Sequence, residues 1–143
     1  MRATSANDFG LVKKLMMTIL LPVIVGPLVG TILVYVADVA GLLPAAISIY
    51  MRGQTMLANL VSGYVSGGLQ ALICGVTFAL AGWFSGRLSV WVPIVTGLVL
   101  AALFALTLFG TSGHGIVFSA IIHLVPALVT WWLVRGYWIR ADA

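Results

Sequence analysis

Charged residues are scarce in this chain. Only 7% of its 143 residues are Asp, Glu, Lys or Arg, whereas about a quarter of the residues of a soluble domain are charged. At the same time 62% of the residues are apolar, and the mean hydropathy is +1.19. These proportions exclude an ordinary soluble domain and predict an integral membrane protein.

Residues that carry chemistry are equally few. The single cysteine, Cys74, excludes an intramolecular disulfide and a metal cluster held by thiolates. The chain has only two histidines and three acidic residues, and it shows no paired carboxylates, phosphate loop or nucleophile motif. Metal sites usually need three or four protein ligands. We therefore predict no metal, no cofactor and no catalytic activity.

The positive charge does not form a patch. Seven Lys and Arg residues give a net charge of +4, but they stand at the ends of apolar segments, so we expect no binding to nucleic acid. An α-helix needs about 20 residues to cross roughly 30 Å of hydrocarbon. Four apolar segments meet this length, at about 15–36, 56–84, 88–109 and 116–134.

Short turns rich in Gly and Ser join the later segments, at residues 85–87 and 111–115. Neighbouring helices should therefore run antiparallel and pack side by side. The sequence predicts an all-α fold: one transmembrane domain over 1–143, built as an up-down-up-down four-helix bundle in the lipid bilayer.

The region 37–55 is too polar at its ends to span a membrane and too apolar to be a solvated loop. Pro44 stands at a plausible helix start, and apolar residues follow at helical spacing, namely Leu43, Ile47, Tyr50 and Met51. We expect a short helix on the outer surface or a shallow re-entrant turn.

The basic residues predict an orientation. With the N-terminus inside, the cytoplasmic side carries Arg2, Lys13, Lys14, Arg87, Arg135 and Arg140, and the outer side carries only Arg52. This asymmetry agrees with the positive-inside rule. A cluster of aromatic residues at the cytoplasmic end of the last span should lie at headgroup depth: Trp131, Trp132, Tyr137 and Trp138. We expect a bacterial inner-membrane protein with both termini in the cytoplasm.

Small residues recur at every fourth position of the predicted spans. The second span carries Gly63, Gly67, Ala71, Gly75 and Ala79; the third carries Gly97, Ala101 and Ala105; the first carries Gly26 and Gly30. Helices in lipid associate through close backbone packing, which small residues permit. We interpret these rows as helix-packing faces, whose partner is either a helix of this chain or another protein.

A polar row runs beside the small residues of the second span, at Ser62, Ser66, Gln70 and Cys74. It could face a polar seam, or its hydroxyls could bond back to their own helix. If the row faces a polar seam, we expect its side chains to form hydrogen bonds between helices rather than to line a path for water.

Ionisable groups inside a membrane are costly and therefore candidates for function. His123 lies in the middle of the fourth predicted span. We expect a neutral imidazole bonded to a neighbouring helix, with a proton relay or ligand binding as the alternative. Asp38 follows the first span; it would cap the next segment or pair with Arg52, and cation capture is the alternative.

The motifs "GPLVG" at 26–30 and "SGYVSGG" at 62–68, with the short turn that contains Arg87, resemble small four-span bacterial inner-membrane proteins without an assigned function. The resemblance implies only a fold and a location. Small multidrug exporters match in size but carry an essential Glu in their first helix, and the first span here has no acidic residue.

Two functions follow as hypotheses. The first is a non-catalytic structural or accessory subunit that packs through its Gly/Ala faces, as a homo-oligomer or within a larger membrane complex. The alternative is a small oligomeric channel or transporter for a proton or small solute, whose path is lined by the Ser62, Ser66 and Gln70 row and by His123.

Overall fold

A computed structural model of the chain describes residues 5–51, 54–108 and 112–139. Over these residues it contains helices and no strand, which confirms the all-α prediction. The helices are α1 (Ser5–Val39), α2 (Ala45–Met51), α3 (Met56–Ser85), α4 (Trp91–Leu108) and α5 (Gly113–Ile139).

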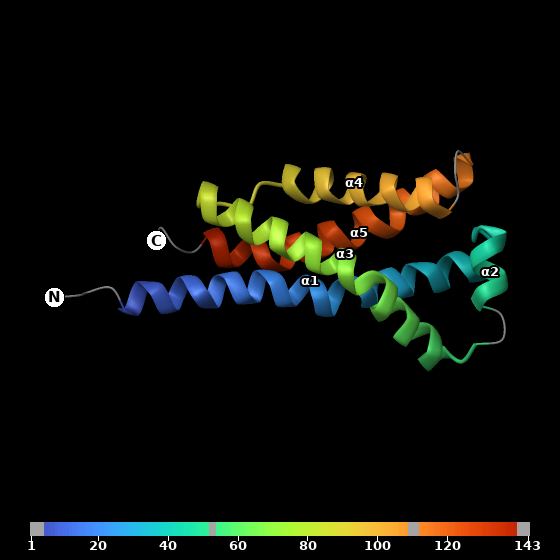
Figure 1. The fold of residues 1–143 in the computed structure, drawn as a ribbon, viewed down its shortest axis with the longest axis horizontal. Helices are drawn as coiled ribbons and strands as arrows, with labels where there is room; N and C mark the ends of the chain where they lie inside the picture. Colours follow the sequence, from blue (N-terminus) through green and yellow to red (C-terminus); the bar gives the residue numbers. More distant parts are fainter. Residues whose placement is uncertain (1–4, 52–53, 109–111, 140–143) are drawn as a thin grey trace.

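Three of these helices have the length and composition of membrane spans, and a fourth is apolar but shorter. Helices α1, α3 and α5 are long and apolar enough to cross a bilayer, and α4 is a shorter apolar helix of 18 residues, which corresponds to about 27 Å. In chain order the four run antiparallel (Figure 1). The protein is therefore membrane-embedded.

The surface of α1 is suited to lipid. Large apolar side chains are exposed at every fourth position along it, at Val12, Met16, Leu20, Ile24, Leu28, Ile32 and Val36. Residues four apart share one face of a helix, so these side chains form one continuous apolar stripe. Such a stripe is stable in contact with acyl chains and costly in contact with water.

A glycine ends the first span. Gly41 has φ 69°, in the left-handed region that favours glycine. Its N–H donates to the Asp38 carbonyl over 3.0 Å, and the Leu42 N–H donates to the Ala37 carbonyl over 2.8 Å. This is a Schellman cap. It places the end of α1 at Val39 and keeps Asp38 inside the helix.

The predicted short helix after the first span is present as α2. The Pro44 carbonyl accepts hydrogen bonds from the N–H groups of Ile47 and Ser48, at 2.9 and 3.1 Å. The helix covers seven residues, and it lies across the end of the bundle where α1 finishes (Figure 1).

The helices are not packed in chain order. Helix α3 packs against α1, α1 also packs against α5, and α5 packs against α4, whereas α3 and α4 contact one another only sparsely. The expectation that α3 and α4 lie side by side is wrong: they meet at their joining turn and then diverge (Figure 1).

Two glycines explain this order. A Cβ at Gly75 of α3 would lie 2.8 Å from the carbonyl oxygen of Ile19 in α1, and a Cβ at Gly97 of α4 would lie 3.1 Å from Cα of Leu124 in α5. Each glycine therefore marks a close approach between backbones. The approach draws α3 to α1 and α4 to α5, so the space between α3 and α4 is left open.

The end of the bundle formed by the start of α1 and the end of α5 is held together by a buried tryptophan. Trp138 is 5% exposed, and its Nε1–H donates to Oγ1 of Thr18 over 3.0 Å. Its ring covers Gly82 of α3, and the Lys14 ammonium lies 6.0 Å from the ring centroid. Trp138 is therefore buried between helices, whereas Trp132 is exposed. That these rings lie at headgroup depth stays a prediction.

Candidate functional site

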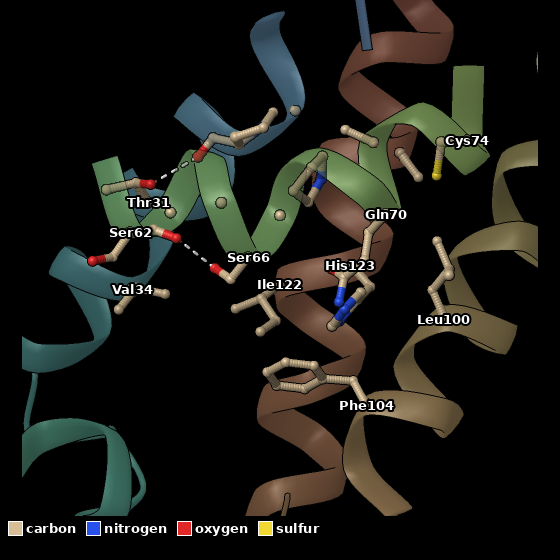
Figure 2. Close-up of a pocket in the computed structure, with 18 of the residues that line it drawn as sticks. Thr31, Val34, Ser62, Ser66, Gln70, Cys74, Leu100, Phe104, Ile122 and His123 are labelled. Carbon is tan, nitrogen blue, oxygen red and sulfur yellow. Dashed lines mark hydrogen bonds between the residues drawn. The ribbon is translucent and has the colours of Figure 1, made fainter. Parts of the chain in front are cut away.

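A cleft of about 520 Å³ lies between the diverging helices α3 and α4, and side chains from all five helices line it (Figure 2). Ligand pockets for small molecules commonly measure about 300–1,000 Å³. Most of the lining is apolar or glycine, with a few polar side chains that include Ser66, Gln70 and His123. A cleft of this kind can hold a small, largely apolar molecule.

The small-residue row of α3 forms part of the cleft while it packs against α1. Ala71 Cβ lies 3.4 Å from the position of a Cβ at Gly26, and a Cβ at Gly67 would lie 3.7 Å from Cβ of Pro27. All four residues also line the cleft. Because Gly26, Gly67 and Ala71 carry little or no side chain, the two helices meet closely and the space beside their contact stays unfilled.

Other small residues of these rows pack within the chain. Ala79, Ala101 and Ala105 are buried, and a Cβ at Gly63 would collide with Oγ1 of Thr31. The structure thus places the Gly/Ala rows of α3 and α4 inside the chain, against α1 and α5.

Gly30 does not pack as the sequence predicts. A Cβ at this position would meet no atom within 4 Å, and the residue lines the cleft. Its neighbour in the same row, Gly26, does contact α3. Gly30 is therefore a position where a larger side chain can enter the cleft without displacing a helix.

His123 is a buried ionisable group that lines the cleft. The residue is 6% exposed, and its Nδ1 lies 2.7 Å from the carbonyl oxygen of Ser119, one turn earlier in α5. A carbonyl oxygen only accepts hydrogen bonds, so Nδ1 must carry the proton. The expected bond to a neighbouring helix is wrong for this nitrogen, because the imidazole bonds to its own helix.

This bond determines the role of the other ring nitrogen. In a neutral imidazole with a proton on Nδ1, Nε2 is an acceptor with a free lone pair. Nε2 of His123 is buried and has no hydrogen-bond partner in the part of the chain that the structure describes. A buried polar atom without a partner costs about 1–3 kcal/mol. The cleft therefore contains an acceptor that is suited to bind a donor from outside the protein.

An aromatic ring borders the imidazole. The Phe104 ring of α4 lies beside His123, with the ring centroids 4.9 Å apart and the planes inclined by 54°. Figure 2 shows the two rings in the same part of the cleft. Phe104 thus adds an apolar wall next to the polar nitrogen.

The polar row of α3 faces the cleft. Ser62, Ser66, Gln70 and Cys74 line it, all from one side of that helix. The Ser66 hydroxyl donates to the Ser62 carbonyl over 2.7 Å, so for Ser66 the alternative of a bond back to its own helix holds. The Gln70 amide has no hydrogen bond to another described residue, and it projects from α3 into the cleft (Figure 2).

The remaining predicted site residues lie elsewhere. Asp38 is half-buried in the last turn of α1, outside the cleft, and Arg52 lies outside the described residues. Helix α2 begins only at Ala45, so Asp38 does not cap it. His114 is exposed at the start of α5. Among the described residues no three His, Cys, Asp or Glu side chains form a group that could hold a metal ion.

Several hydrogen bonds between helices were not predicted. The Ser119 hydroxyl of α5 donates to the Ala101 carbonyl of α4 over 2.7 Å, and the Tyr64 hydroxyl of α3 donates to the Ile24 carbonyl of α1 over 2.7 Å. These side chains bond to backbone carbonyls, whose positions depend on how the helices pack. No sequence pattern could indicate such pairs. The sequence shows only that Ser119 is a polar residue one helical turn before His123.

No protein-family model, curated protein or solved structure matches the chain. The interpretation of the cleft therefore depends on its own geometry and chemistry.

Proposed function

We propose that this protein is a non-catalytic integral membrane protein that binds a small lipid-soluble molecule in the cleft between α3 and α4. The observation that supports this most strongly is Nε2 of His123, a buried acceptor without a partner among the described residues, in a cleft of about 520 Å³. Ligand sites are typically apolar hollows with a few polar groups that fix orientation.

The position of the cleft favours a ligand that arrives through the bilayer. His123 stands three residues before the middle of α5, so it lies about 4–5 Å from the midpoint of that helix. A helix that spans the membrane places such a residue near the bilayer centre, where water is scarce. Ser66, on the α3 side of the cleft, is exposed. A molecule dissolved in lipid can therefore enter between the diverging helices.

Location belongs to the same proposal. The start of α1 and the end of α5 lie at one end of the bundle (Figure 1), and the positive charges near both ends favour a cytoplasmic position under the positive-inside rule. We propose a bacterial inner-membrane protein with both termini in the cytoplasm.

Assembly as a homo-oligomer or within a larger complex stays a prediction. It would have to use surfaces other than the Gly/Ala rows of α3 and α4, because these rows pack within the chain at Gly75 and Gly97. The channel hypothesis also stays a prediction. It requires flux into liposomes that decreases in His123→Ala.

The proposal is tested by purification from the native membrane in a mild detergent, followed by native mass spectrometry. A Leu side chain in Gly30→Leu would enter the cleft, whereas Gly68→Leu is a matched control: Gly68 also has open space at its Cβ position but does not line the cleft. We expect the same small molecule on the wild type and on Gly68→Leu, and its loss from Gly30→Leu. Equal retention by all three proteins, or no bound molecule on any of them, would contradict the proposal.

A further inference from the structure

We infer that the molecule in the cleft presents a hydroxyl donor to Nε2 of His123, which makes it a neutral, lipid-soluble alcohol or phenol. This inference rests on the proposed function and specifies the chemistry of the ligand.

The tautomer of His123 requires a donor from the ligand. The Ser119 carbonyl lies 2.7 Å from Nδ1 and can only accept, so the ring proton is on Nδ1. The neutral ring then has only an acceptor to offer at Nε2. A ligand whose polar groups are carbonyls or ethers would place an acceptor against an acceptor, and the nitrogen would stay unsatisfied. A ligand hydroxyl removes the cost of the unpaired nitrogen.

The charges around the cleft favour a neutral imidazole and a neutral ligand. An imidazolium could donate from Nε2, but a charged group near the bilayer centre is costly unless an opposite charge lies beside it. Among the described residues no Asp or Glu lines the cleft. Asp38 lies at the end of α1, outside it. The neutral ring is therefore the form that the site supports, and a ligand with an anionic group has no cationic partner there.

The shape and polarity of the surroundings favour an aromatic ligand. The Phe104 ring lies beside the imidazole, with 4.9 Å between the centroids, and aromatic rings pack favourably against one another in offset or tilted arrangements. The Gln70 amide provides one donor group and one acceptor on the α3 side of the cleft. A flat ring with a hydroxyl satisfies these features together, so a phenol is the preferred member of the class.

The experiment compares two probes, one with a hydroxyl donor and one in which a methyl group replaces the hydroxyl hydrogen. The first is 6-fluoro-2-naphthol, and the second is its methyl ether, which has the same ring and oxygen but no O–H group. Both dissolve in lipid, and 19F NMR in nanodiscs follows the binding of each to the wild type, His123→Leu, Gly30→Leu and Gly68→Leu. Because the two probes partition differently into lipid, the decisive quantity is how the ratio of their dissociation constants changes between proteins.

We expect the wild type to favour the naphthol over the ether more than His123→Leu does, by about two- to tenfold, the range for one hydrogen bond. Gly68→Leu should behave as the wild type does, and both probes should lose binding in Gly30→Leu. If both probes bind in the cleft and His123→Leu leaves the ratio unchanged, the hydroxyl inference is overturned while the proposed function stands. If neither probe responds to Gly30→Leu, the cleft is not their site and both proposals fail.

Discussion

The contact between α1 and α3 at Gly75 gives a sharp prediction for stability. A Cβ added there would lie 2.8 Å from the carbonyl oxygen and 2.9 Å from Cα of Ile19. Favourable contacts between heavy atoms begin at about 3.5 Å, so in Gly75→Ala the two helices must separate by roughly 0.5 Å or more. The obstacle is backbone, which cannot rotate away as the end of a side chain can. We therefore expect the variant to lose contacts along the crossing.

The magnitude follows from two opposed effects. Overpacking of this kind costs about 1–3 kcal/mol, while replacement of Gly by Ala within a helix contributes about 1 kcal/mol of stability. Gly68→Ala is a matched control, because Gly68 lies on the same helix with no atom within 4 Å of its Cβ position. The helix contribution cancels between the two variants. Gly75→Ala should therefore be about 1–3 kcal/mol less stable than Gly68→Ala.

The assay is reversible unfolding in mixed micelles of a mild detergent and dodecyl sulfate, followed by tryptophan fluorescence. Gly67→Ala provides a second control, because its Cβ would make an ordinary contact of 3.7 Å with Pro27, and it should resemble Gly68→Ala. Equal free energies of unfolding for Gly75→Ala and Gly68→Ala would refute the close approach of α3 to α1.

Three further predictions concern other contacts. Trp138→Phe removes the hydrogen bond to Thr18 and leaves a cavity, because the Phe ring is smaller than the indole. We expect a destabilisation of about 1–3 kcal/mol in the same unfolding assay. Ser119→Ala removes the bond to the Ala101 carbonyl between α5 and α4, and the free energy of unfolding should fall by about 1 kcal/mol. Gly30→Leu should unfold within about 1 kcal/mol of the wild type, because its side chain enters open space; a large loss would show that the cleft is filled by protein.

The fold was largely predictable because its strongest signals are local. Four apolar segments bounded by Gly and Ser turns indicate four helices in alternating directions, and Pro44 correctly indicates the start of α2. The order of packing was not predictable. A row of small residues shows that a helix has a close neighbour, but nothing within the row identifies that neighbour. The short turn at residues 85–87 therefore suggested α4 as the neighbour of α3, whereas the backbone contact at Gly75 is with α1.

The candidate site was predictable only in part. His123 could be selected because a polar residue in the middle of an apolar span is costly, and Ser66 and Gln70 because they lie on one face of their helix. That these residues from two helices share a cleft depends on the divergence of α3 and α4, which is a property of the whole bundle. The role of Gly30 was missed for the same reason, since a glycine that packs and a glycine that leaves space look alike in a sequence.

Both proposals require that His123 offers an unpaired acceptor at Nε2 inside the membrane. The most direct measurement is the 15N NMR spectrum of the imidazole in lipid bilayers, on His114→Gln protein, in which His123 is the one remaining histidine. We expect a protonated Nδ1 and an unprotonated Nε2, with the Nε2 resonance shifted when 6-fluoro-2-naphthol is added and unchanged with its methyl ether. A ring with the proton on Nε2, or a spectrum that responds equally to both compounds, would contradict it.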